Sequence, residues 1–351
     1  MKTLDIGFIG CGGVFNKRHY PTLKRLPRYR IVACCDTNRI KLDKLERDYG
    51  IKSTFTDYRD MLQKVPMDIA AVSSPVTTHT QIAMDILDAG LHLFLEKPAT
   101  FTIEECDRLI EKAKSSPGKL IIGYNKRYMP NIRKAKQALE RGELGQIEAV
   151  QFLFSTGHRV AELPDWRKER ALGGGSFIEE SCHILDFWNW YSDKPFNRVC
   201  SATSRLGGCD DNPVAFMAEN QDGALFQALV SDTLPDQNRF TILGKDKVMR
   251  LYTHQFDGFE IQPRGVYDGD LKQRLQNGVK FIRYLPQIGT LWKVGGVYHL
   301  SYYYMWKNFH EAITNNVPVL NSLEETRNVQ ILIKALVDSA DQNKWIEINR
   351  Y

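Results

Sequence analysis

Short apolar runs alternate with longer amphipathic stretches over about the first 125 residues. The amphipathic stretches, such as TQIAMDILDAG (80–90) and IEECDRLIEKAK (103–114), place apolar residues at helical spacing. Strands that alternate with helices of this length predict βαβ units and a parallel sheet, and right-handed crossovers make the domain doubly wound. The predicted strands are IGFI (6–9), RIVACC (30–35), IAAVSS (69–74), LHLFL (91–95) and KLIIGY (119–124).

The pattern changes after about residue 145, where apolar residues recur at every second position. Turn residues such as Asp222-Gly223 separate these segments, which predicts a mainly antiparallel sheet. Helical spacing returns in 305–315 and 322–340. We therefore predict a doubly wound α/β domain over 1–124 and an α+β domain over 125–351. The period-two segments include IEAVQFLFS (147–155), VAFMAENQ (214–221), GALFQALVS (223–231) and RFTILG (239–244).

Composition narrows the class of protein. A length of 351 residues suits two domains, and 43% apolar with 25% charged residues is typical of a globular protein. The sequence has no apolar run of about 18 residues and no export signal at its start, so we expect a cytoplasmic protein without a transmembrane segment. The seven cysteines are scattered without a CxxC pair, which argues for reduced thiols and against structural zinc. A net charge of +5 gives no reason to expect nucleic acid binding.

A glycine turn follows the first predicted strand. Gly10 and Gly12 fit the first two positions of G-x-G-x-x-G, where glycine permits the tight turn and the close approach of a pyrophosphate. Phe15 occupies the third position, which predicts a displaced helix, and Gly13 relieves some of the crowding. With Val14, this turn is the predicted dinucleotide-binding segment.

Asp36 ends the second predicted strand at the spacing of a carboxylate that binds the adenosine ribose. A carboxylate there repels a 2′-phosphate, so NAD is favoured over NADP. Arg39 nearby leaves NADP open. The alternative for Asp36 is a helix cap or turn residue.

The stretch GGGSFIEESCHILD (173–186) places Glu179 four residues before His183. On one helix these side chains share a face, so Glu179 could orient an imidazole that titrates near neutral pH. The alternative is a solvated polar pair. We do not expect a metal at Cys182 and His183, because adjacent helical residues point about 100° apart and no third ligand is evident.

Four further segments follow the glycine turn and lead into the 173–186 stretch, in this order along the chain: AAVSSPVTTH (70–79), HLFLEKP (92–98), LIIGYNKRYMP (120–130) and DWRKERALGGG (165–175). With the glycine turn and the 173–186 stretch, this series resembles the Gfo/Idh/MocA oxidoreductases over essentially the whole chain. The resemblance implies a large open sheet in the second domain that often mediates oligomerisation. It also implies NAD-dependent hydride transfer to or from a secondary alcohol of a sugar, cyclitol or sugar derivative.

The resemblance also implies roles for individual residues. Lys97 reaches the substrate and His183 matches the active-site histidine, so either is a candidate for the base, with Glu179 beside His183. Glu179 stands where the family has Asp, and Ser181 replaces a glycine. The remaining implied residues lie along the cofactor, together with Lys97: Glu96, Ser74, Pro75, His79, Asn125, Trp166 and Arg167. Arg127 and Tyr302 are implied at the substrate, together with Lys97, Glu179 and His183.

Two features leave alternatives open. Between Arg264 and Lys293, six basic residues face only Asp268 and Asp270, and 271–293 carries apolar residues at helical spacing. This segment could pack on the sheet or another subunit, contact an anionic substrate, or touch a membrane surface. For the whole protein, the alternatives to a dehydrogenase are an NAD-dependent glycosidase without net oxidation and a non-catalytic NAD- and sugar-binding regulator. We expect a homodimer or homotetramer.

Overall fold

The computed structural model describes residues 2–192, 194–266 and 270–348, and only the backbone at 272, 273, 276, 277, 280 and 283. The chain forms two compact units. The first comprises the residues through Asn125 together with Tyr302–Gln330, and the second comprises Lys126–Ser301 with the residues from Ile331 onward. The segment 302–330, which the predicted boundary assigned to the second domain, is thus part of the first unit.

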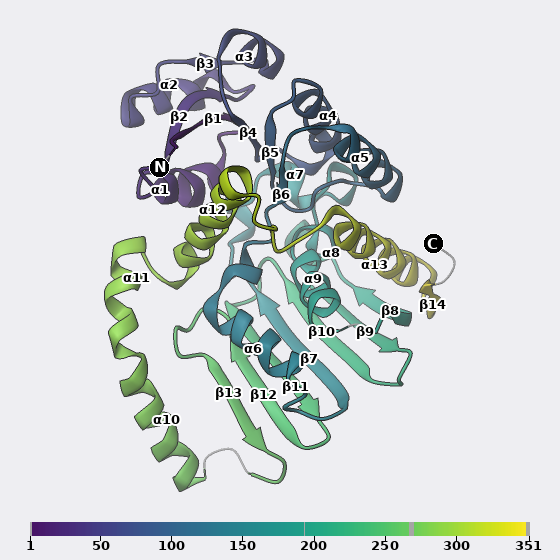
Figure 1. The fold of residues 1–351 in the computed structure, drawn as a ribbon. Helices are drawn as coiled ribbons and strands as arrows, with labels where there is room; N and C mark the ends of the chain where they lie inside the picture. The colour runs from purple at the N-terminus through teal and green to yellow at the C-terminus, as the bar shows by residue number, and fades with distance from the viewer. Residues whose placement is uncertain (1, 193, 267–269, 349–351) are drawn as a thin grey trace. The chain divides into compact units, whose positions relative to one another are not determined.

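A six-stranded parallel sheet in the order β3-β2-β1-β4-β5-β6 forms the centre of the first unit (Figure 1). This strand order is that of a doubly wound dinucleotide-binding fold and confirms the predicted fold class of this part. The strands are β1 (Leu4–Ile9), β2 (Tyr29–Cys35), β3 (Thr54–Phe55), β4 (Ile69–Val72), β5 (His92–Leu95) and β6 (Leu120–Ile122).

The helices of this unit begin and end where local signals predict. Asn38 caps α2, Gly50 ends it with positive φ, and Thr102 with Glu105 forms a capping box at the start of α5. The helices are α1 (Tyr20–Leu23), α2 (Arg39–Tyr49), α3 (Tyr58–Lys64), α4 (His79–Asp88) and α5 (Ile103–Ser115), with short turns η1 (Phe15–His19), η2 (Val76–Thr78) and η3 (Asn125–Tyr128), the last continuing into the second unit.

Phe15 changes the start of the first helix. Its ring is fully buried and meets the ring of Phe8 edge-on, with the centroids 4.9 Å apart. The backbone from Phe15 to His19 takes a π-helical turn, η1, before α1 continues as an α-helix. An aromatic pair therefore fills the place where a third glycine would let helix and strand approach closely, and the wider turn accommodates it.

An eight-stranded sheet in the order β13-β12-β11-β7-β10-β9-β8-β14 forms the second unit. Its neighbours pair antiparallel except for β7 with β10, so the predicted large, mainly antiparallel sheet is confirmed. The strands are β7 (Ile147–Ser155), β8 (Phe196–Thr203), β9 (Val214–Asn220), β10 (Leu225–Ser231), β11 (Gln237–Gly244), β12 (Lys247–Tyr252), β13 (Phe259–Pro263) and β14 (Ile346–Glu347).

Helices α6 and α9 cover one face of this sheet (Figure 1). Phe187 of α9 stacks with Phe152 and Phe240 of the sheet, while Met217 and Leu225 on the opposite face are about half exposed. The helical elements are α6 (Pro130–Glu140), η4 (Val160–Glu162), α7 (Asp165–Lys168), η5 (Arg170–Leu172), α8 (Ser176–Glu179), α9 (Ser181–Tyr191), η6 (Leu206–Gly208), α10 (Leu271–Tyr284), η7 (Leu285–Gln287) and α11 (Ile288–Val294). Two further helices, α12 (Val297–Asn315) and α13 (Leu323–Gln342), have residues in both units.

The basic segment forms α10 and α11, which confirms its helical spacing. At the end of α10, Phe281 and Tyr284 contact Phe256, and Lys134 donates to the Tyr284 hydroxyl at 2.9 Å. Along another side of α10, four apolar side chains are more than half exposed: Leu271, Leu275, Val279 and Ile282. Asp268 lies outside the described residues, and the partner of this segment stays a prediction.

Candidate functional site

The carboxyl ends of β1, β4 and β5 bring three predicted segments to one edge of the first sheet. Gly10 has φ of +88°, and a Cβ built on it would lie 2.5 Å from the Ser74 backbone nitrogen. The Ser73 hydroxyl donates to the Gly10 carbonyl at 2.6 Å. Glycine is therefore required at position 10, because the turn packs directly on the next strand end.

The remainder of the glycine turn has the space that a dinucleotide needs. Cβ atoms built on Gly12 and Gly13 meet nothing within 4 Å, and Val14 is 41% exposed. Backbone N–H groups at the start of a helix bind anions such as a pyrophosphate. The residues of this turn thus fit the phosphate end of a bound NAD.

Asp36 is buried and accepts hydrogen bonds from the backbone nitrogens of Cys11 and Asn38, both at 2.9 Å. Asn38, and not Asp36, caps α2, so the alternative of a cap does not apply to Asp36. The Lys41 ammonium lies 3.2 Å from the Asp36 carboxylate. The predicted basic neighbour Arg39 instead pairs with Asp43 at 2.9 Å. Asp36 holds the glycine turn and presents a carboxylate beside it.

His79 links the turns after β4 and β5. Its ring is buried, with Nε2 lying 2.8 Å from the Ser74 carbonyl and Nδ1 lying 2.9 Å from the Pro98 carbonyl. The segments Ser74-Pro75 and Lys97-Pro98 are therefore tied together through one imidazole. The Lys97–Pro98 peptide bond is cis.

The carboxylate of Glu96 is directed into the first unit. Its Oε1 lies 2.9 Å from His19 Nε2, and its Oε2 accepts a hydrogen bond from the Lys97 backbone nitrogen at 3.0 Å. Trp306 Nε1 donates to the other ring nitrogen of His19 at 3.1 Å. Glu96 was predicted beside the nicotinamide riboside, and that role stays a prediction. Its hydrogen bonds are with the Lys97 backbone and with His19, and neither His19 nor Trp306 was identified from the sequence.

Two further predicted residues are buried in this unit. Tyr302, predicted at the substrate, packs its ring edge-on against His19 with the centroids 5.2 Å apart. Asn125 is 1% exposed. Their predicted binding roles stay predictions.

The acid–histidine stretch of the second unit forms two short helices. Gly175 has φ of +83°, α8 ends at Glu179, and α9 begins at Ser181. The assumption that one continuous helix carries Glu179 and His183 is therefore wrong. The Ser181 hydroxyl donates to the Ser176 carbonyl at 2.9 Å, and this local bond accompanies the interruption.

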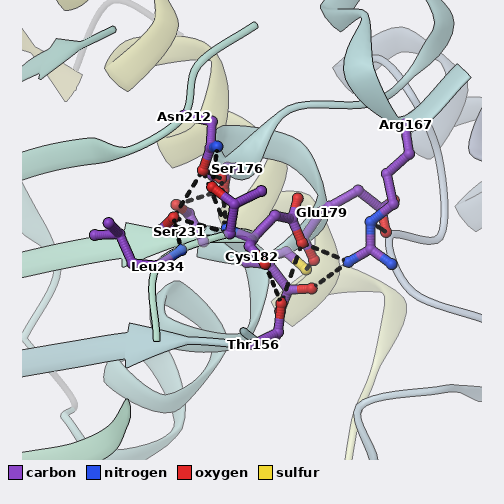
Figure 2. Close-up of polar contacts among 12 residues, drawn as sticks. Thr156, Arg167, Ser176, Glu179, Cys182, Asn212, Ser231 and Leu234 are labelled. Carbon is purple, nitrogen blue, oxygen red and sulfur yellow. Dashed lines mark hydrogen bonds and ion pairs between the residues drawn. The ribbon is translucent and has the colours of Figure 1, made fainter. Parts of the chain in front are cut away.

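Arg167 lies among three carboxylates (Figure 2). Its Nη2 is 2.6 Å from Glu180 and 2.7 Å from Asp232, and its Nε is 3.9 Å from Glu179. Burial by itself lowers the pKa of Arg167, but Asp232, Glu179 and Glu180 outweigh burial and raise that pKa above its ordinary value. Arg167 was predicted beside the cofactor with Trp166. In the second unit it holds the carboxylates in the neighbourhood of α8 and α9.

Asn212 ties α8 to the end of β10 (Figure 2). Its side-chain oxygen accepts from the hydroxyls of Ser176 at 3.3 Å and Ser231 at 2.8 Å and from the Asp232 nitrogen at 3.2 Å. The same cluster therefore fixes the start of α8 and the backbone of Asp232, which pairs with Arg167.

His183 is 5% exposed, and its ring lies 6.3 Å from that of Phe154. The Lys126 ammonium lies 3.4 Å from the centroid of the same Phe154 ring, in a cation–π contact, and Lys126 is 2% exposed. The sequence named its neighbours Asn125 and Arg127 but missed Lys126. One signal in the sequence could have identified Lys126: it stands among apolar and aromatic residues, as a buried side chain would. A buried lysine is rare, so it is a candidate for function.

Arg127 is fully buried and pairs with Asp186. Its Nη2 lies 2.6 Å from Asp186 Oδ1, its Nε lies 2.9 Å from Oδ2, and its guanidinium is 5.3 Å from the Trp190 ring centroid. Arg127 was predicted to bind the substrate. Its bidentate pair with Asp186 connects η3 to α9, the helix of His183.

Neither a metal-binding cluster nor a membrane-spanning helix is found among the described residues. No three His, Cys, Asp or Glu side chains in the described ranges are grouped to hold a metal ion. In the part of the chain that the structure describes, no helix combines the length and apolar content needed to cross a membrane.

Two family models match the chain. The Gfo/Idh/MocA model, described as an oxidoreductase family with an NAD-binding Rossmann fold, matches residues 4–124, and the Gfo/Idh/MocA C-terminal domain model matches residues 132–250. Together they match more than half of the chain. The chain belongs to the Gfo/Idh/MocA family. The first unit of this Gfo/Idh/MocA protein is accordingly an NAD-binding domain, as the glycine turn predicted.

Curated relatives and solved structures agree with the family. The uncharacterized oxidoreductase YrbE of Bacillus subtilis is 25% identical over 72% of each chain. The myo-inositol 2-dehydrogenase of Thermotoga maritima is 27% identical over 58% of this chain and 59% of the relative, so less than two thirds of that relative is matched. The WlbA dehydrogenase from Bordetella pertussis, solved with NADH and UDP-GlcNAcA, is 21% identical with a TM-score of 0.82 over 99% of this chain and 98% of that one.

The length of Glu179 is testable in this Gfo/Idh/MocA protein. We expect Glu179→Asp to keep the substrate preference and to lower kcat by roughly tenfold or less, because shortening the side chain displaces a carboxylate that positions and does not react. Steady-state kinetics on two substrates measure this. Glu162→Asp, on an exposed side chain, is the control. An altered ratio of kcat/KM between substrates would show that Glu179 contacts the substrate.

Because of Cys35, the stability of the NAD-binding domain should fall as the pH rises through the alkaline range. Burial, followed by the charges of Cys11, Asp36 and Asp57, raises the pKa of Cys35 from 9.0 to about 12. The unfolded chain releases this proton near pH 9 and the folded chain does not. The free energy of unfolding therefore falls as the pH rises from 9 towards 12, by at most about 1.4 kcal/mol per pH unit. Denaturant unfolding at several pH values measures the slope, and a Cys35→Ala variant with the same slope would contradict it.

Proposed function

We propose that the protein transfers a hydride between NAD and a secondary alcohol of a sugar, cyclitol or nucleotide sugar. The observation that carries the proposal is Lys97, whose backbone is held by Glu96 at the edge of the sheet that also presents the glycine turn. Bound NAD would supply the hydride acceptor. The myo-inositol dehydrogenase and the WlbA complex with UDP-GlcNAcA support an alcohol carbon on a ring as the reacting group.

The proposed chemistry needs a hydride acceptor and a base. Oxidation moves a hydride from the alcohol carbon to NAD and a proton from the alcohol oxygen to a base. Lys97, half-exposed at the carboxyl end of β5, donates to the alcohol oxygen and stabilises its developing negative charge. Two assignments of the base remain: His183, on α9 of the second unit, takes the proton in one, and Lys97 takes it in the other. Arg167 pairs with Glu180, which immediately precedes α9, the helix of His183.

A screen of inositols, free sugars and nucleotide sugars with NAD and NADP tests the function. We expect NADH to form with at least one class of substrate and to form faster than NADPH, because a carboxylate at Asp36, which is bonded to the glycine turn, would repel a 2′-phosphate. Product formation without a change in NADH absorbance would assign the protein to the glycosidase alternative. NAD binding without any product across the panel would overturn catalysis and leave a regulator.

The exposed apolar residues of the second sheet support the proposal of a homodimer or homotetramer. Met217, Leu225 and Leu243 are 40% exposed or more, and α10 carries further exposed apolar side chains. Sedimentation velocity tests this. A monomer at micromolar concentration would contradict it, and would direct attention to an anionic ligand or a membrane surface as the partner of α10.

A further inference from the structure

A chain of three side chains leads from α12 to the backbone of Lys97, entirely within the first unit. Trp306 Nε1 donates to His19 Nδ1 at 3.1 Å, His19 Nε2 lies 2.9 Å from Glu96 Oε1, and Glu96 Oε2 accepts from the Lys97 nitrogen at 3.0 Å. His19 and Trp306 are fully buried and Glu96 is 6% exposed. The chain is thus shielded from water along its length.

The indole of Trp306 decides which nitrogen of His19 carries the proton. An indole N–H can only donate, so His19 Nδ1 must accept. The proton of the neutral ring is then on Nε2, which donates to the Glu96 carboxylate. A second proton on Nδ1 would face the indole N–H with no acceptor between them. Trp306 therefore holds His19 as a neutral donor towards Glu96.

Packing leaves this arrangement little freedom. The His19 ring meets the rings of Phe94 and Tyr302 edge-on, with centroid distances of 5.1 and 5.2 Å. The Trp306 ring stacks on Phe94 at 4.4 Å, and a Cβ added at Gly123 would lie 2.7 Å from Glu96 Oε2. The imidazole cannot turn over without displacing aromatic neighbours, and Glu96 Oε2 occupies space that a glycine at position 123 leaves open.

We propose that His19 is a positioning residue for Lys97, acting through Glu96 in the tautomer that Trp306 imposes. This inference rests on the proposed function, in which Lys97 touches the substrate. Both oxygens of Glu96 accept hydrogen bonds, one from His19 and one from the Lys97 backbone. Removing the His19 donor frees one side of the carboxylate and releases the turn that carries Lys97.

The kinetic test compares His19→Leu, which removes the donor, with His19→Gln, whose amide can donate to Glu96. We expect His19→Leu to lower kcat by up to about 10²-fold, since a displacement of about 1 Å has this effect, and His19→Gln to recover most of it. Trp306→Phe, which keeps the stacking but not the N–H, should alter the pH profile of kcat. The matched control is His310→Leu, at a buried histidine of α12 whose Nε2 lies 2.9 Å from the Lys2 carbonyl.

A second readout does not depend on turnover. In ¹⁵N spectra of histidine-labelled protein at neutral pH, we expect His19 to show a pyrrole-type Nε2 and a pyridine-type Nδ1, and Trp306→Phe to change this pattern. Modification of the Lys97 amine, followed by mass spectrometry, should change in rate in His19→Leu and not in His310→Leu. If no substrate is found for the unaltered protein, the proposed function fails while these two measurements still decide the inference.

Three results would overturn the inference. The first is a proton on His19 Nδ1 in the spectra. The second is an unchanged rate of Lys97 modification in His19→Leu. The third is equal loss of kcat in His19→Gln and His19→Leu with unaltered pH profiles, which would show that His19 contributes to stability alone.

Discussion

We expect Lys97→Ala to lower kcat by about 10² to 10⁴-fold while NAD still binds, because the amino group proposed to stabilise the alcohol oxygen or to take its proton is lost. The glycine turn and Asp36 are untouched by this change, so the dissociation constant for NAD should stay the same. Stopped-flow or steady-state kinetics measure the first quantity, and quenching of intrinsic fluorescence by NADH measures the second.

The control for this prediction is Lys64→Ala, at an exposed lysine of the same unit that pairs with Asp60. Comparing the pH profile of His183→Gln with that of Lys97→Ala distinguishes the two candidates for the base, since the lost ionisation belongs to the residue that takes the proton. Turnover near that of the unaltered protein in Lys97→Ala would refute the mechanism, whichever residue is the base.

The second large effect concerns stability. We expect Arg127→Met to lower the free energy of unfolding by about 3–5 kcal/mol, because it leaves the Asp186 carboxylate buried without its cation. Arg127→Met combined with Asp186→Leu should recover much of the loss, since no charge is then left unpaired. Urea unfolding measures both.

An exposed ion pair supplies the comparison. Arg30 lies 2.7 Å from Asp5, but its side chain is 69% exposed, so Arg30→Met should lower the free energy of unfolding far less than Arg127→Met does. If the single and double variants at Arg127 and Asp186 lose the same stability, then lost packing and not the unpaired charge determines the effect.

The predictions from the sequence succeeded where the cause was local. The apolar periods gave the parallel and antiparallel sheets because strand and helix periods are properties of adjacent residues. The need for glycine at position 10 follows from one tight turn, and Phe15 in place of a glycine correctly indicated an altered first helix. These features depend on neighbours in the chain, which a sequence displays directly.

The predictions failed or stopped short where distant segments meet. Helical spacing suggested that Glu179 and His183 share one helix, but α8 ends at Glu179 and α9 begins at Ser181, whose hydroxyl donates to the Ser176 carbonyl. Asn212 and Asp232, which hold α8 and Arg167, lie more than 30 residues beyond α8 along the chain, just before β9 and just after β10. His19 is 77 residues from Glu96 and 287 from Trp306, and no periodic pattern relates positions so far apart.

The return of 302–330 to the first unit has a consequence for synthesis of the protein. The NAD-binding domain begins at the N-terminus, yet the aromatic side chains around His19 include Trp306 and Tyr302, which the ribosome makes only after strands β7 to β13 of the second sheet. A nascent chain that ends before residue 302 therefore exposes the apolar surface that these rings cover. A chain released before residue 302 lacks a finished nucleotide-binding domain, although all six strands of the parallel sheet have already been made.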